Sequence, residues 1–155
     1  MNRLIDGLAT LGPVGYLPRA PATWASALVT LIGWFLPAPP WGWTVVALAG
    51  GGTLAVWICG QAERRLGHDA HPIVLDEVVG QSLALLGAPR TWPAFAAAFA
   101  LFRLFDIWKP LGAREAQALP GGLGVVTDDV IAGLASCEAL HLGLWGARAA
   151  GLLPA

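Results

Sequence analysis

Apolar runs separated by proline-rich breaks dominate the chain. The stretch from Ala20 to Ala62 contains no Asp, Glu, Lys, Arg or His, which is long enough for two membrane crossings of about 20 residues each. Pro37-Ala38-Pro39-Pro40 divides this stretch, so we predict a hairpin of two helices, one over Ala22–Leu36 and one over Trp41–Cys59. Residues 1–21 are rich in Gly and Pro and are predicted to form a loop.

The second half of the chain predicts three further helices. One extends from Pro72 to Ala88, with Asp69 as a possible N-cap, and spans roughly 25 Å. The next runs from Pro93 to Trp108, and the last begins at Thr127-Asp128-Asp129 and continues towards Gly151, after a loop over residues 111–123. The pattern indicates a single domain over residues 1–155. Its fold class is all-α, a polytopic helical membrane protein with about five short transmembrane or re-entrant helices.

Composition supports the membrane interpretation. Hydrophobic residues make up 56% of the chain and charged residues 12%, whereas an average soluble domain has about 25% charged residues. So few charges could not cover the surface of a soluble protein. The formal net charge is −1 and there is no basic block, so nucleic acid is not an expected partner.

The distribution of cations predicts the orientation in the membrane. With five crossings, two cations fall on one side, Arg90 and Arg148, and seven fall on the other: Arg3, Arg19, Arg64, Arg65, Arg103, Lys109 and Arg114. The side with more cations is expected to be cytoplasmic. No cleaved signal peptide is expected, because charged residues interrupt the apolar pattern before residue 20.

Acidic residues gather on that same predicted side: Asp69, Asp76, Glu77, Asp106, Asp128 and Asp129. Carboxylates at a membrane boundary are costly unless they are paired or bind a cation. Magnesium prefers carboxylate and water oxygens, commonly together with substrate phosphate, so we predict a magnesium site. Candidate partners for a phosphate are Arg19, Arg103, Lys109 and Arg114.

A structural role for these acids is the alternative. Asp76, Glu77, Asp128 and Asp129 are predicted at helix starts, where capping and the helix dipole favour acids. Asp106 is predicted near a helix C-terminus, where the dipole disfavours an anion, although an ion pair with a neighbouring cation would account for it.

Two further features have open interpretations. Gly121-Gly122 could form a nest of backbone N–H groups for a phosphate or an ordinary flexible turn. Glu138 and His141, one turn apart, could form an intramembrane ion or proton site or a simple hydrogen-bonded pair.

Four motifs in order resemble the phosphatidylglycerophosphatase A family. They are Gly15-Tyr16-Leu17-Pro18-Arg19-Ala20-Pro21-Ala22-Thr23 with Ser26, then His68-Asp69 followed by Ile73-Val74-Leu75-Asp76-Glu77-Val78-Val79-Gly80, then Phe102-Arg103-Leu104-Phe105-Asp106-Ile107-Trp108-Lys109-Pro110, and finally residues 121–133, Gly-Gly-Leu-Gly-Val-Val-Thr-Asp-Asp-Val-Ile-Ala-Gly. The chain departs from the family pattern after Pro110, where Leu111-Gly112-Ala113 replaces an aromatic-Pro-Ile run.

The resemblance implies a magnesium-dependent enzyme of the bacterial inner membrane that removes the terminal phosphate of phosphatidylglycerophosphate at the cytoplasmic face. Its expected magnesium ligands are Asp76, Glu77, Asp106, Asp128 and Asp129, and its expected catalytic residues are Asp76, Glu77, Asp106, Asp129 and Lys109. Expected substrate contacts are Arg19, Thr23, Arg103, Lys109, Gly121 and Gly122. The expected partners are this phospholipid and the bilayer. The alternative is a small non-enzymatic membrane protein, either a cation pathway or an assembly subunit.

Overall fold

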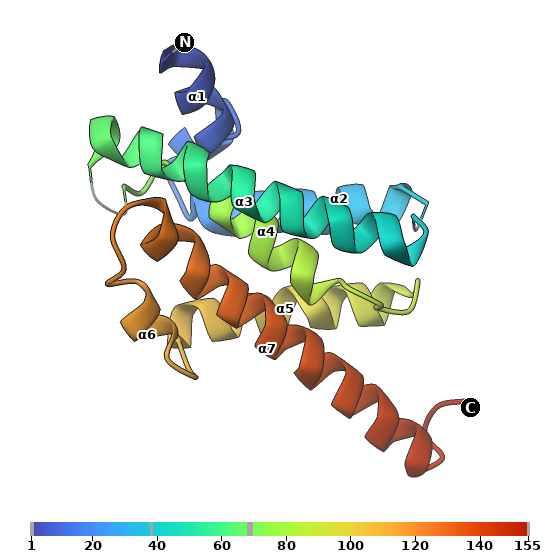
Figure 1. The fold of residues 1–155 in the computed structure, drawn as a ribbon. Coiled ribbons are helices and arrows are strands. Elements are labelled where there is room, and N and C mark those ends of the chain that lie inside the picture. The colour runs from blue at the N-terminus through green and yellow to red at the C-terminus, as the bar shows by residue number, and fades with distance from the viewer. Residues whose placement is uncertain (1, 38, 68–69, 155) are drawn as a thin grey trace.

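The computed structural model describes residues 2–37, 39–67 and 70–154, and within these ranges it is entirely helical. Its elements, in chain order, are α1 (Asn2–Ala9), the 3-10 turn η1 (Val14–Tyr16), α2 (Pro21–Phe35), α3 (Trp41–Leu66), α4 (Leu75–Ala84), α5 (Trp92–Trp108), α6 (Ala113–Ala116) and α7 (Gly122–Ala149) (Figure 1). The expected all-α class is therefore confirmed for the described part of the chain.

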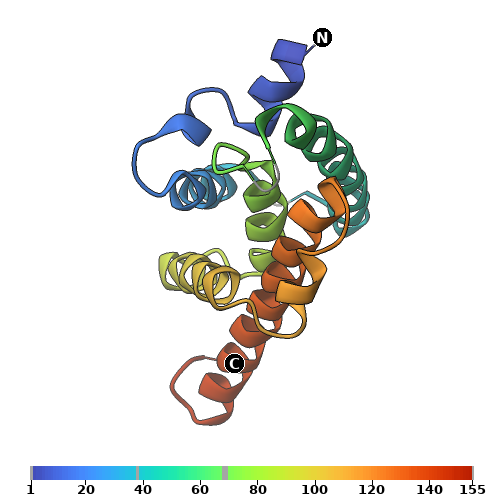
Figure 2. The ribbon, with the colours of Figure 1, turned by 90° about the vertical axis from the view of Figure 1, so that its left-hand side faces the viewer.

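The short helix α4 lies at the centre of the molecule. Helices α2, α3, α5 and α7 all pack against it (Figure 2), so most of its side chains are buried. At about 15 Å, α4 is too short to cross a bilayer. It is a helix enclosed by longer helices.

The helices alternate in direction, which brings five of their ends together. In Figure 1, α2, α4 and α7 begin at the left-hand side of the molecule, and α3 and α5 end there. This shared end collects the acidic first turn of α4, the last turn of α5 and the first turns of α7. Residues far apart in the sequence can therefore build one site.

The predicted N-terminal loop contains a helix, α1, which corrects the expectation for residues 1–21. The prolines lie at position 13 and beyond and restrict only the backbone near them, so residues 2–9 are free to be helical. Ile5 and Ala9 pack into an apolar core with α3. Asp6 also forms an ion pair with Arg65 of α3.

Helix α4 begins at Leu75, three residues after Pro72, because the preceding backbone has other partners. The Val74 amide donates to the Ala9 carbonyl at 2.9 Å. A Cβ on Gly15 would lie 2.0 Å from the Pro72 carbonyl oxygen, so only glycine allows this approach. Asp69, the expected N-cap, lies outside the described residues.

Other features also differ from the expectations, and helix α4 ends at Ala84, before the expected Ala88. Helix α3 continues beyond Cys59 to Leu66, and α6 forms a single helical turn inside the predicted loop over residues 111–123. Helix α7 begins at Gly122 rather than Thr127. Tertiary contact explains this early start. A Cβ on Gly122 would lie 1.9 Å from the Val56 carbonyl oxygen of α3, so Gly122 allows α7 to pack closely on α3 despite the low helix propensity of glycine.

Two of the described helices, α3 and α7, are long and apolar enough to cross a membrane, and α2 is a shorter apolar helix. Only 17% and 28% of the most apolar stretches of α3 and α7 are buried within the protein. Large apolar side chains instead cover the outside, among them Phe35, Trp43, Ile107, Leu142 and Trp145. An exposed apolar surface of this extent is typical of contact with lipid or a partner. The expected set of about five transmembrane or re-entrant helices remains a prediction, and α4 is too short to be one of the crossings.

Candidate active site and metal centre

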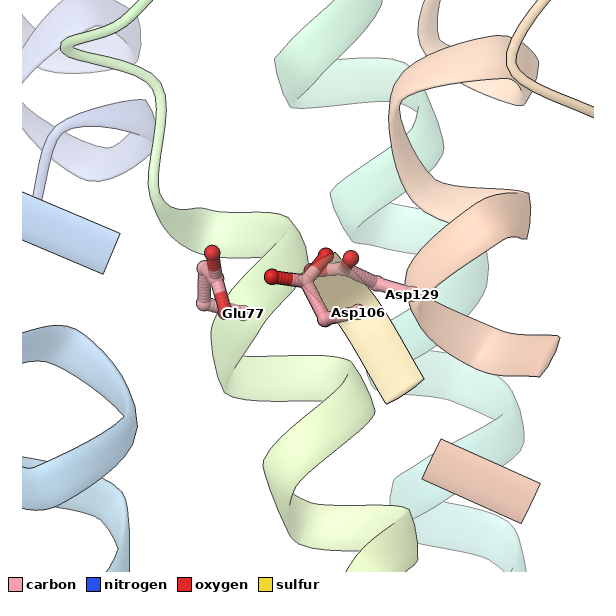
Figure 3. A group of neighbouring side chains, drawn as sticks. All are labelled: Glu77, Asp106 and Asp129. Atoms are coloured by element: carbon pink, nitrogen blue, oxygen red, sulfur yellow. The ribbon is translucent and has the colours of Figure 1, made fainter. Parts of the chain in front are cut away.

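Three carboxyl groups from three helices meet at the shared end of the bundle. Glu77 of α4, Asp106 of α5 and Asp129 of α7 each offer an oxygen within 4.8 Å of the other two. Their carboxyl groups point toward one another in Figure 3. Glu77 is only 6% exposed and Asp129 only 4%, so water screens their mutual repulsion poorly.

A contact between two glycines permits this convergence. Gly80 lies about one turn after Glu77 on α4, and Gly133 lies about one turn after Asp129 on α7. A Cβ on Gly133 would lie 2.3 Å from the Gly80 carbonyl oxygen. The backbones of α4 and α7 can therefore touch only because both positions lack a side chain.

Arg103 and Ser26 hold Glu77 in place. Arg103 Nη1 of α5 lies 2.6 Å from Glu77 Oε2 and 3.1 Å from Asp106 Oδ2. The Ser26 hydroxyl of α2 donates to the same Glu77 oxygen at 3.1 Å. Asp106 therefore has the ion pair with a neighbouring cation that the structural alternative required. This ion pair would account for Asp106 near a helix C-terminus without a metal ion. However, Arg103 supplies one positive charge to two carboxylates, Glu77 and Asp106.

A second ion pair joins the end of α5 to α7. Lys109 is the C-cap of α5 and adopts a left-handed backbone conformation, and its ammonium group bonds Asp128 Oδ2. Burial opposes charging of this amine, but the hydrogen bond to Asp128 and the nearby charges of Asp128 and Asp106 outweigh it and raise the pKa of Lys109. Lys109 is thus held as a cation beside the three-carboxyl cluster.

Capping does not account for Asp128 and Asp129. Because α7 begins at Gly122, Asp128 and Asp129 lie about two turns into the helix, and its first turn contains no acid. The capping interpretation of this pair is wrong for that reason. Asp76 and Glu77 do lie in the first turn of α4, where Asp76 Oδ1 accepts a hydrogen bond from the Glu77 amide at 2.9 Å.

Negative charge exceeds positive charge at this site. Among the residues that the structure describes, five carboxyl groups lie here with two cations, Arg103 and Lys109. Burial, followed by the charge of Asp106, raises the pKa of Glu77 to about 7, against the opposing effects of Arg103 and Ser26. Asp129 Oδ2 is buried and has no hydrogen-bond partner among the described residues. Hard oxygen ligands, excess negative charge and an unpartnered buried oxygen together fit a divalent cation, which Glu77, Asp106 and Asp129 would hold.

Other predicted site residues lie outside the three-carboxyl cluster. Arg19 is exposed in the loop before α2, and Thr23 is partly buried in the first turn of α2. Gly121 and Gly122 lie at the start of α7 against α3, where Gly122 packs on Val56. Arg114 lines a surface hollow of about 350 Å³ formed by residues 108–112, 114 and 115. Two of these residues, Leu111 and Gly112, belong to the segment that departs from the family pattern.

Sequence reasoning missed two buried polar residues near the site. Ser26 was noted only as part of a motif, although Ser26 and Thr30 are spaced to share one face of an apolar helix. Gln81, four residues after Glu77, is fully buried, and neither of its amide atoms has a partner among the described residues. A polar residue on the buried face of a short central helix was the available signal.

His141 does not pair with Glu138 as suggested. Its Nδ1 lies 2.8 Å from the Cys137 carbonyl oxygen, and its Nε2 lies 3.2 Å from the Gly87 carbonyl oxygen. These contacts connect α7 to the loop between α4 and α5, away from the acidic end.

The fold and the site define a class: an all-helical protein with an apolar exterior and a buried acidic site suited to a divalent cation and a phosphate. A family model described as phosphatidylglycerophosphatase A matches residues 7–144. The chain therefore belongs to the phosphatidylglycerophosphatase A family, as its motifs indicated, and it is a lipid phosphatase. This assignment decides against the non-enzymatic alternative.

Similar proteins include two that carry the family's name and one that carries another phosphatase name. A Bacteroides thetaiotaomicron protein named "Putative phosphatidylinositol-3-phosphatase" is 41% identical over 84% of this chain and 87% of its own length. Proteins named phosphatidylglycerophosphatase A from Escherichia coli and Haemophilus influenzae are 32% and 36% identical, over 82% and 77% of this chain and 76% of each relative. No solved structure matches the chain at a significant level.

Proposed function

We propose that this chain hydrolyses the terminal phosphate of phosphatidylglycerophosphate to give phosphatidylglycerol and inorganic phosphate, with Mg²⁺ as cofactor. The observation that carries the proposal is the convergence of Glu77, Asp106 and Asp129 from three helices, beside Arg103 and Lys109. The names of two relatives, from Escherichia coli and Haemophilus influenzae, support the substrate.

Each residue has a distinct task in this proposal. Glu77, Asp106 and Asp129 hold the ion, which when bound polarises the phosphoryl oxygens. Arg103 fixes Glu77 and Asp106 through its two short contacts. Lys109, kept charged by Asp128, faces the negative charge that develops on the phosphoryl group. Asp76 and Asp128 adjoin the three-carboxyl cluster, and one of the five acids accepts the proton of the attacking water or attacks phosphorus itself.

We place the active site at the cytoplasmic face of the bacterial inner membrane in a multi-pass protein. The shared end of the bundle carries Arg64 and Arg65 at the end of α3 together with Arg103 and Lys109. Cytoplasmic segments are enriched in such cations. A lipid anchored by its acyl chains would present its headgroup at a fixed depth, so the site needs only to orient the phosphate.

A second candidate substrate comes from the Bacteroides thetaiotaomicron relative, whose name specifies phosphatidylinositol 3-phosphate. Both lipids carry a phosphomonoester on a polyol headgroup, so the same acidic site would serve either. The two substrates differ in the size and stiffness of the group next to the phosphate.

The test is phosphate release by the purified protein in detergent micelles. Phosphatidylglycerophosphate, phosphatidylinositol 3-phosphate and soluble glycerol 3-phosphate are compared, each with Mg²⁺ and with excess chelator. We expect the highest kcat/KM with phosphatidylglycerophosphate and no turnover in chelator. Asp106→Asn, prepared in parallel, controls for contaminating phosphatases. A higher kcat/KM with the inositol lipid would show that phosphatidylinositol 3-phosphate is the preferred substrate. Full activity in chelator would refute the requirement for a metal ion.

A further inference from the structure

An apolar groove runs along the outside of the bundle between α2 and α5. It is a hollow of about 210 Å³ whose lining is almost entirely apolar: Ala27, Thr30 and Leu31 from α2, and Trp92, Ala96 and Phe99 from α5. Trp34 stacks on Trp92 with ring centroids 4.4 Å apart. Trp92 of this aromatic pair lines the end of the groove farther from the acidic site.

The other end of the groove lies on the side of Glu77. Ser26 lies one turn before Thr30 on α2, and Arg103 lies one turn after Phe99 on α5. These two residues, one from each wall, are the ones that bond Glu77 Oε2, at 3.1 Å and 2.6 Å. The groove and the three-carboxyl cluster therefore share helix α5, and one residue from each groove helix bonds the same carboxylate of the cluster, Glu77.

We propose that this groove binds one acyl chain of the lipid substrate while the phosphate lies at the three-carboxyl cluster. The inference rests on the proposed function, because a lipid phosphatase must receive a molecule that is charged at one end and apolar at the other. An apolar groove that ends at a cation-lined acidic site matches that shape. Ala27 and Ala96 keep the groove open because their side chains are small.

The groove contributes orientation rather than affinity. A chain that moves from the bilayer into the groove exchanges one apolar environment for another, so it gains little hydrophobic free energy. Holding the chain against α2 and α5 limits the positions of the headgroup, which raises the fraction of bound lipid with its phosphate correctly placed. Filling the groove should therefore reduce turnover of long-chain lipids more than turnover of lipids too short to reach it.

The first experiment fills the groove. Ala96 is exposed on α5, so Ala96→Trp adds bulk without entering the core. Ala47→Trp, at an exposed position of α3 outside the groove, is the matched control. Dipalmitoyl and dibutyryl phosphatidylglycerophosphate are compared in the same detergent. We expect Ala96→Trp to lower kcat/KM about tenfold for the dipalmitoyl lipid and less than twofold for the dibutyryl lipid, and Ala47→Trp to change neither. Equal effects of Ala96→Trp on both lipids would refute the proposal that the groove binds an acyl chain.

A second experiment measures binding independently of turnover. A photo-crosslinking side chain is placed at Ala96 or at Ala47 in vesicles that contain equal amounts of phosphatidylglycerophosphate and phosphatidylcholine. At Ala96 we expect preferential capture of the phosphomonoester lipid, and at Ala47 capture in proportion to abundance. Equal capture at Ala96 would mark the groove as ordinary lipid-facing surface. If the variant with the crosslinker at Ala96 captures this lipid selectively but the wild type does not hydrolyse it, the proposed function is wrong and the lipid-binding role of the groove still holds.

Discussion

Removing the charge of Asp129 is the most decisive perturbation of the proposed metal centre. Asp129→Asn keeps the shape of the side chain and removes one negative charge from a position that is 4% exposed. Oxygens of Glu77 and Asp106 lie within 4.8 Å, and Asp129 Oδ2 has no hydrogen-bond partner among the described residues to lose. In the metal-free protein the substitution should therefore relieve repulsion without breaking a described contact of that oxygen.

The expected size of this effect follows from the geometry. Two unit charges at the 4.8 Å limit of these separations repel by about 3.5 kcal/mol at an effective dielectric constant near 20. Arg103 and protonation of the cluster cancel most of this repulsion in the metal-free protein. We therefore expect Asp129→Asn to raise the free energy of unfolding in chelator by at most about 1–2 kcal/mol, with the larger gain at high pH, where the cluster holds fewer protons. With Mg²⁺ present, loss of a charged ligand should lower kcat by about a hundredfold or more.

The assay combines thermal unfolding in detergent, with chelator and with Mg²⁺, and phosphate release. Mg²⁺ should raise the unfolding temperature of the wild type, because a ligand that binds only the folded state stabilises it, and should leave that of Asp129→Asn nearly unchanged. Asp6→Asn is the matched control, because Asp6 pairs with Arg65 away from the site. The control should lose less than about 1 kcal/mol and stay active. An active Asp129→Asn enzyme that Mg²⁺ still stabilises would refute the metal centre.

Other predictions follow from the site and its support. Burial raises the pKa of Glu77 to about 7, above its value in the unfolded chain, so protonation of Glu77 stabilises the fold. This stabilisation is fully present below about pH 4.5 and is lost as the pH rises through about 7. The free energy of unfolding in chelator should therefore fall between pH 5 and 8, and Glu77→Gln should make it less dependent on pH in this range. Gly133→Ala would place a Cβ 2.3 Å from the Gly80 carbonyl oxygen, so it should cost about 1–3 kcal/mol and abolish stabilisation by Mg²⁺. Gly143→Ala, on the same helix with open space around it, should be neutral or slightly stabilising. Unfolding temperatures with and without Mg²⁺ compare the two variants, and equal behaviour would contradict the packing argument.

The sequence by itself determined the helical class, the apolar character of the chain and the residues worth testing. Apolar runs, prolines and the scarcity of charge are local or compositional properties, so they can be read without a fold. The apolar runs and prolines predicted the first and last residues of α2 and α5 to within one position. The acids were identified by their cost at a membrane boundary, and the order of the four motifs identified the family.

Only the tertiary structure decided which acids meet. Asp128 and Asp129 are adjacent in sequence, yet Asp128 pairs with Lys109 and Asp129 joins Glu77 and Asp106, because successive residues of a helix point about 100° apart. The close approach of Gly80 and Gly133 sets the separation of α4 and α7, and no local pattern encodes it. The contact of Gly122 with α3 likewise extended α7 over a glycine-rich segment. Each of these outcomes depends on how one helix is rotated and packed against another, which is a property of the assembled bundle.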